Sequence, residues 1–119
     1  MQVGIDILEI ERFLEIEKDE KKLKRMFTEK EIEYFNKYTF KTNHIAGLFC
    51  AKEAFVKALK TGFTKDIGML DVEILHEESG APYVNLQNEK IKKLLGENKN
   101  VDINISHNNS MATAICIIF

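Results

Sequence analysis

The chain has 119 residues, of which 45% are hydrophobic and 30% charged, and it contains a single proline. This composition predicts one compact domain, residues 1–119, and excludes disordered and fibrous chains. The 17 basic and 19 acidic residues leave a net charge of −2, which argues against a nucleic-acid partner held by bulk electrostatics. No apolar run is long enough to cross a bilayer and no secretory leader is recognisable, so we expect a cytoplasmic protein without a membrane partner.

The residues that usually hold structural metals are scattered along this sequence. Cys50 and Cys116 lie in apolar runs and form no Cys-x-x-Cys pattern, so we expect two buried, reduced thiols. His44, His76 and His107 are far apart and match no zinc-binding spacing. Stability therefore requires neither a disulfide nor a zinc ion.

The N-terminal quarter begins with a predicted strand over residues 2–8, where the side chains alternate with the period of two that strands show. Its two faces carry different residues, with Val3, Ile5 and Ile7 on one and Gly4, Asp6 and Leu8 on the other. Residues 9–25 mix charged and apolar side chains, which indicates helical segments that partly face water. A capping box over Thr28–Glu31 marks the next helix start, and we expect a buried stripe of Ile32, Phe35 and Tyr38 behind it.

The strongest helix signal lies over residues 44–60, where apolar residues recur at helical spacing. Asn43 is a plausible N-cap, and Gly62 is expected to stop the helix. Residues 71–74 and 83–86 predict a hairpin around Glu78-Ser79-Gly80, and residues 88–96 predict a short amphipathic helix. Residues 101–106 and 111–119 predict a second hairpin with a polar bend. The fold class is therefore α+β.

Four residues could carry chemistry, although each also has an ordinary structural explanation. Glu53 and Lys57 are four apart, which is typical of a surface ion pair on a helix. Asp6 sits in the middle of a strand, where a carboxylate needs a partner or water. His107 opens a turn, yet a lone histidine is more often structural. Between Lys18 and Lys41 eight basic residues oppose five acidic ones, which suits either an acidic protein partner or a solvated helix face.

Taken together, these segments resemble a known family. The chain carries Gly4-Ile5-Asp6-Ile7-Leu8-Glu9 near its start and Phe49-Cys50-Ala51-Lys52-Glu53-Ala54-Phe55-Val56-Lys57 some forty residues later. In this order, with Thr61-Gly62-Phe63, Gly80-Ala81-Pro82 and Ile105-Ser106-His107, the motifs closely resemble the bacterial holo-acyl-carrier-protein synthases, the short 4′-phosphopantetheinyl transferases. The resemblance covers essentially the whole chain.

The resemblance implies an enzyme of fatty acid biosynthesis that transfers the 4′-phosphopantetheine arm of coenzyme A to a serine of apo acyl carrier protein, releasing adenosine 3′,5′-bisphosphate. By similarity, Asp6 and Glu53 would be catalytic and hold Mg²⁺, and Lys57 would act on the same phosphates. The remaining coenzyme A contacts would come from Gly62, Ser106 and His107. The expected fold is that of the 4′-phosphopantetheinyl transferases, assembled as a homotrimer with sites between subunits.

Acyl carrier proteins are acidic, so a basic surface is expected to bind them. Arg12 is the main candidate for this contact, and the cluster Lys21, Lys22, Lys24 and Arg25 would extend it. The chain departs from the family pattern at Leu48, Lys60 and Asn108, where relatives often carry arginine, glycine and a small hydroxyl residue. Two alternatives remain, a silent relative that only binds the carrier or coenzyme A and an unrelated ferredoxin-like binding domain.

Overall fold

A three-stranded antiparallel sheet packed on one long helix forms the centre of the computed structural model, which describes residues 1–119. In chain order the elements are β1 (Gln2–Glu9), the 3₁₀ helix η1 (Ile10–Phe13), α1 (Leu14–Glu17), α2 (Glu20–Met26), α3 (Glu29–Phe35), α4 (Lys41–Ala58), the 3₁₀ helix η2 (Met69–Asp71), β2 (Ile74–His76), β3 (Pro82–Val84), α5 (Glu89–Leu95), β4 (Val101–His107) and β5 (Met111–Ile118). The α+β prediction is confirmed.

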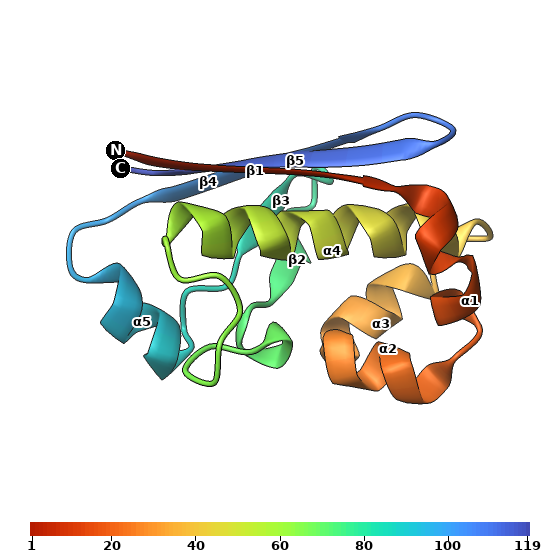
Figure 1. The fold of residues 1–119 in the computed structure, drawn as a ribbon, viewed down its shortest axis with the longest axis horizontal. Coiled ribbons are helices and arrows are strands. Elements are labelled where there is room, and N and C mark those ends of the chain that lie inside the picture. Colours follow the sequence, from red (N-terminus) through yellow and green to blue (C-terminus); the bar gives the residue numbers. More distant parts are fainter.

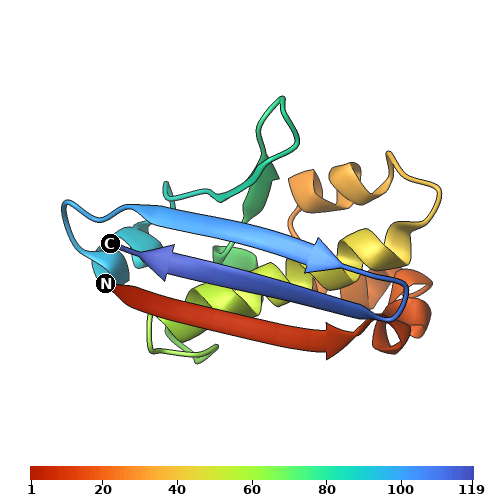
Figure 2. The ribbon, with the colours of Figure 1, turned by 90° about the horizontal axis from the view of Figure 1, so that it is seen from above.

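The sheet has the order β1-β5-β4, so the first and last strands are neighbours. Figure 1 shows α4 running along one face of the sheet, with α1, α2 and α3 gathered at one of its ends and α5 near the other. Seen from above in Figure 2, β1 and β4 form the two edges, and the β2–β3 hairpin lies beyond β4. One side of α4 therefore faces the β1 edge and the other faces the β4 edge.

The helix α4 approaches the sheet very closely because small residues line the contact. Gly4 of β1 lies against α4, and a Cβ atom there would overlap the carbonyl oxygen of Ala54 and the amide nitrogen of Ala58. On the β4 side, a Cβ at Gly47 would lie 3.2 Å from Cγ2 of Ile105. Glycine is thus required at position 4 by close packing rather than by backbone conformation.

A fully buried ion pair ties the helical end of the molecule to α4. Nζ of Lys52 lies 2.7 Å from Oε1 of Glu31, and neither side chain is exposed. Lys52 also donates to the carbonyl oxygens of Met26 and Met69, at 2.7 and 2.9 Å. Glu31 accepts from the backbone of Thr28 in the predicted capping box, which is confirmed, and from the backbone of Ile74.

Several predicted boundaries are wrong. The helix α4 begins at Lys41, three residues before the expected start, and Asn43 lies inside it rather than at the N-cap. It ends at Ala58, and Lys60 adopts a φ of 69° ahead of Gly62. The expected strand over residues 71–74 is a 3₁₀ turn followed by β2. Tyr38 lies beyond the end of α3 and is 38% exposed, so it is not part of a buried stripe.

The outer face of the sheet, which α4 does not cover, is apolar and open. Val3, Ile5, Ile7 and Ile115 are 44%, 62%, 64% and 38% exposed. They occupy facing positions on β1 and β5, since Val3 pairs with Ile117 and Ile5 with Ile115. A contiguous apolar surface of this kind usually marks an interaction site. No helix is long and apolar enough to cross a membrane.

Candidate active site

The pairing of β1 with α4 brings Asp6 and Lys57 together across 51 residues of sequence. Nζ of Lys57 lies 2.9 Å from Oδ1 of Asp6 and 3.1 Å from the carbonyl oxygen of Ile5. The strand β5 pairs with only one edge of β1, so a carbonyl on the other edge takes no part in the sheet and can accept from Lys57. The Asp6 side chain is 15% exposed and that of Lys57 is 50% exposed, so the pair is open to an incoming molecule.

Glu53 lies one helical turn before Lys57, and the charges of Asp6 and Lys57 both affect its pKa. Burial raises the pKa of its carboxyl group, and the negative charge of Asp6 raises it further, whereas Lys57 and Arg12 act in the opposite direction. The simple surface ion pair between Glu53 and Lys57 does not form, because Lys57 binds Asp6 instead. The hydrogen bond to Asp6 raises the pKa of Lys57, which keeps this lysine protonated.

Two carboxylates thus converge beside an accessible lysine at the β1 edge. The chain holds no group of three or more carboxylate, imidazole or thiol side chains arranged to bind a metal ion on their own. Mg²⁺ is commonly held by one or two carboxylates together with water and substrate phosphates, so the donor set fits that ion. It does not fit a structural zinc site, which takes four protein ligands.

Cys50 also contacts this site, which no sequence pattern indicates. Its thiol lies beneath Asp6, with Sγ 3.5 Å from Oδ2 and 3.7 Å from the carbonyl oxygen of Ala112. Burial and the charge of Asp6 raise the pKa of Cys50 to about 12, so the thiol stays protonated and can donate to the carboxylate. Both cysteines are free and buried, as predicted.

Arg12 is exposed on the surface and lies close enough to Glu53 for its charge to act there. It follows β1 in the short helix η1. The predicted carrier-binding cluster is separate from it and lies on the exposed helix α2 (Lys21, Lys22, Lys24 and Arg25). Within that cluster, Lys24 pairs with Glu20 at 3.3 Å.

The predicted coenzyme A contacts are not brought together within one chain. Gly62 follows the C-terminal end of α4, whereas His107 ends β4 near the N-terminal end of that helix. Ser106 precedes His107 and pairs with Thr113, so its side chain points to the opposite face of the sheet. The residues assigned to one ligand therefore lie at two ends and two faces of the molecule.

The three departures from the family pattern have separate structural settings. Leu48 is 2% exposed and lines a cavity next to His107. Lys60 occupies the left-handed region that favours glycine. Asn108 organises the turn between β4 and β5, because its Oδ1 accepts from the backbone of Ser110 and Met111 at 2.9 and 2.8 Å.

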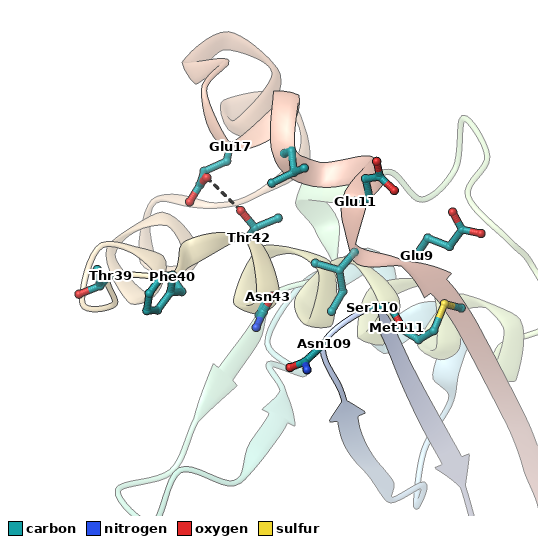
Figure 3. A pocket seen from close by; sticks show the side chains of 12 residues that line it. Glu9, Glu11, Glu17, Thr39, Phe40, Thr42, Asn43, Asn109, Ser110 and Met111 are labelled. Carbon is teal, nitrogen blue, oxygen red and sulfur yellow. Dashed lines mark hydrogen bonds between the residues drawn. The ribbon is translucent and has the colours of Figure 1, made fainter.

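A cavity of about 770 Å³ lies elsewhere in the molecule and is not lined by the predicted catalytic residues. Figure 3 shows it between the end of β1, the start of α4 and the β4–β5 turn, where Glu17 accepts a hydrogen bond from Thr42 at 2.9 Å. Its lining includes Glu9 and Glu11 but no lysine, arginine or histidine. Such a lining repels phosphates, so this cavity does not suit a phosphate-bearing substrate.

Comparisons with known proteins identify the family to which the chain belongs. The model of the 4′-phosphopantetheinyl transferase superfamily matches residues 2–116. The holo-[acyl-carrier-protein] synthase of Clostridium botulinum (strain Alaska E43 / Type E3) is 47% identical over 117 residues, covering 98% of this chain and 94% of that protein.

Solved structures of two relatives match the fold over nearly the whole chain. A Bacillus anthracis holo-(acyl-carrier-protein) synthase in complex with CoA (3′,5′-ADP) matches with a TM-score of 0.82 and 29% identity, over 98% of this chain and 94% of that one. The Helicobacter pylori synthase in complex with coenzyme A matches with a TM-score of 0.81 and 32% identity, over 98% and 99%. The chain therefore belongs to the 4′-phosphopantetheinyl transferase superfamily and, within it, to the holo-acyl-carrier-protein synthases.

Proposed function

We propose that this chain transfers the 4′-phosphopantetheine group of coenzyme A to a serine of an apo acyl carrier protein for fatty acid biosynthesis, releasing adenosine 3′,5′-bisphosphate. The observation that carries the proposal is the meeting of Asp6, Glu53 and Lys57 at one accessible edge of the sheet. Phosphoryl transfer depends mainly on positioning and on compensation of negative charge, which this trio can provide. The two buried free thiols fit a reducing compartment, and we place the reaction in the cytoplasm.

Asp6 and Glu53 would hold the Mg²⁺ ion that the reaction requires. When bound, this ion neutralises charge on the pyrophosphate of coenzyme A and helps to orient it. The repulsion between the two carboxylates, which contributes to the raised pKa of Glu53, is the kind of strain that a cation relieves. The thiol of Cys50 holds Oδ2 of Asp6 from below and so limits rotation of the carboxylate.

Lys57 would act on the phosphate groups. Its side chain is half exposed, and an incoming phosphate can replace Asp6 or the backbone carbonyl of Ile5 as an acceptor of its ammonium group. There the ammonium group stabilises the developing charge or protonates the leaving phosphate. The carrier protein would approach over Arg12 and the basic cluster of α2, which offers an acidic partner complementary charge.

A homotrimer with active sites between subunits is also part of the proposal. The open apolar face formed by Val3, Ile5, Ile7 and Ile115 supports burial against another copy. The separation of Gly62 from Ser106 and His107 supports a site completed by a neighbouring chain. Asp6 with Lys57 forms one half-site and His107 forms the other, on opposite sides of α4. The two half-sites can serve one substrate molecule only if they come from different subunits.

The reaction can be tested by incubating the protein with an apo acyl carrier protein, coenzyme A and Mg²⁺ and measuring the intact mass of the carrier. We expect a gain of one phosphopantetheine group, which a chelator abolishes. Asp6→Ala and Glu53→Ala should each lower turnover by orders of magnitude, whereas the exposed control Glu97→Ala should not. Unmodified carrier in the presence of intact assembled protein would favour a silent binding protein instead.

The assembly can be tested separately by sedimentation. Ile5→Lys places a charge on the open sheet face without changing the backbone contact to Lys57, so we expect the trimer to dissociate. Leu70→Lys is the matched control, because Leu70 is 50% exposed outside the sheet. A trimer that survives Ile5→Lys unchanged would show that the interface lies elsewhere.

A further inference from the structure

The two carboxylate oxygens of Asp6 have different partners. Oδ1 lies 2.9 Å from Nζ of Lys57, whose side chain is half exposed. Oδ2 lies 3.5 Å from Sγ of Cys50, a residue with no exposed surface. One oxygen of the carboxylate therefore faces a group that can move away, and the other faces a group held in the core.

The thiol of Cys50 is fixed in its place by the neighbouring strand. Its Sγ lies 3.7 Å from the carbonyl oxygen of Ala112 in β5, as well as next to Asp6. The following residue of β5, Thr113, donates from its hydroxyl to the backbone carbonyl oxygen of Asp6 at 2.8 Å. The strand β5 thus contacts both the thiol and the backbone of Asp6, so the contact between Sγ and Oδ2 does not depend on a flexible segment.

A thiol in this place acts on Asp6 as a hydrogen-bond donor. A buried cysteine beside a carboxylate keeps its proton, and the charged Oδ2 is a stronger acceptor for it than the neutral carbonyl oxygen of Ala112. This bond occupies Oδ2 and restricts rotation of the carboxylate. When a substrate phosphate draws Lys57 away, Oδ1 is the oxygen that becomes available.

The number of available carboxylate oxygens matters for the choice of cation. Mg²⁺ requires a nearly ideal octahedron of ligands, and the two oxygens of one carboxylate lie too close together to fill two of its corners. Ca²⁺ is larger, accepts more oxygens in flexible geometry and takes one or both oxygens of a carboxylate. An Asp6 that offers Oδ1 alone therefore suits the smaller ion, whereas an Asp6 with both oxygens available would suit Ca²⁺ as well.

We propose that Cys50 is a positioning residue that makes Asp6 bind a cation through Oδ1 alone and so favours Mg²⁺ over Ca²⁺. This inference rests on the proposed function, in which Asp6 and Glu53 hold Mg²⁺ at the pyrophosphate of coenzyme A. It adds a selectivity that the two carboxylates do not have by themselves, because carboxylates bind both ions. Removal of the thiol leaves Oδ2 without its donor and available to a cation.

The test measures Mn²⁺ binding by electron paramagnetic resonance in protein saturated with coenzyme A, without carrier protein, and the displacement of Mn²⁺ by Mg²⁺ or Ca²⁺. In Cys50→Ala we expect the affinity for Ca²⁺ relative to that for Mg²⁺ to rise about tenfold. Cys50→Ser restores a donor of similar size, so it should keep the ratio of the wild type. Cys116→Ala is the matched control, because it removes the other buried thiol, which pairs with Gly4 and Ile103 in the sheet.

A second measurement detects the contact itself without altering Cys50. In Cys116→Ala, Cys50 holds the only thiol of the chain, so the S–H stretching band in the infrared spectrum of the free protein belongs to it alone. A hydrogen bond to a carboxylate lowers the frequency of this band. We expect Asp6→Ala to shift the band to higher frequency, whereas the exposed control Glu97→Ala leaves it in place.

An unchanged ratio of the two affinities in Cys50→Ala, or a band that Asp6→Ala does not move, would overturn the role of Cys50 even if the wild type modifies the carrier. An equal rise of the ratio in Cys50→Ala and Cys116→Ala would overturn it too, since loosened packing would then be the cause. A wild type that neither binds Mn²⁺ in the presence of coenzyme A nor modifies the carrier would overturn the proposed function and this inference together.

Discussion

The buried pair of Lys52 and Glu31 gives a sharp test of what holds the helical end of the molecule to α4. In Lys52→Met the side chain keeps its approximate volume but loses the ammonium group. Glu31 then remains buried without its counter-charge, and the carbonyl oxygens of Met26 and Met69 lose their donor. Removing one partner of a buried ion pair costs roughly 3–5 kcal/mol, which lowers the melting temperature by roughly 10–20 °C in a chain of this size.

The pH dependence adds a second and more specific readout. Burial already raises the pKa of Glu31, and Lys52 is the strongest influence that opposes this shift. Without the lysine, the pKa of Glu31 rises further, so the folded state binds a proton that the unfolded state releases. The stability lost in Lys52→Met should therefore be largest near neutral pH and should shrink as the pH falls toward the ordinary range of a glutamate.

Denaturant unfolding at a fixed protein concentration measures both effects, because assembly makes apparent stability depend on concentration. The double variant Lys52→Met with Glu31→Gln should recover part of the loss, since no charge is then left buried. Lys93→Met on the exposed side of α5 is the matched control, with an expected change within about 0.5 kcal/mol. A loss below about 1 kcal/mol in Lys52→Met, with no pH dependence, would refute the reasoning.

Three further predictions follow from single residues. Gly4→Ala should prevent close packing of β1 on α4, with a stability loss of several kcal/mol in thermal unfolding and a loss of Mg²⁺-dependent turnover because Asp6 is displaced. Lys60→Gly should stabilise the chain by about 0.5–1 kcal/mol in denaturant unfolding, because Lys60 has a φ of 69°; a loss of stability would mean that its side chain makes a contact worth more than the strain. Arg12→Ala should raise the KM for the carrier protein more than that for coenzyme A, and added salt should weaken the difference; equal effects on both constants would indicate a structural role.

Local patterns are sufficient to predict the two long strands β1 and β5 and the capped start of α3. The alternation in residues 2–8 and 111–119 identified β1 and β5, and the capping box at Thr28 identified the start of α3. The start of α4 was placed too late because Asn43 looked like an N-cap, whereas Phe40 occupies that position without any side-chain cap. Polar residues in the first turn of a helix are thus an ambiguous boundary signal.

Contacts between distant residues were beyond the reach of local patterns. The pairing of Lys57 with Asp6 spans 51 residues, and spacing alone pointed to Glu53 as the partner. The burial of Lys52 can be inferred from the sequence, because Lys52 lies in the apolar stripe of α4 between Leu48 and Phe55. A lysine at such a position is buried and needs a partner of opposite charge. The proximity of His44, His76 and His107, which line one cavity, has no counterpart in the sequence, because no periodic pattern relates positions on three separate elements.

The helix α4 carries one half-site near each end, which has a consequence for mixtures of subunits. In the proposed trimer every chain belongs to two active sites, providing Asp6 and Lys57 to one and His107 to the other. A chain defective at Asp6 and a chain defective at His107 are each impaired in every site of their own assembly. When the two are unfolded and reassembled together, mixed trimers contain one cleft with both halves intact, so two impaired preparations should regain activity on mixing.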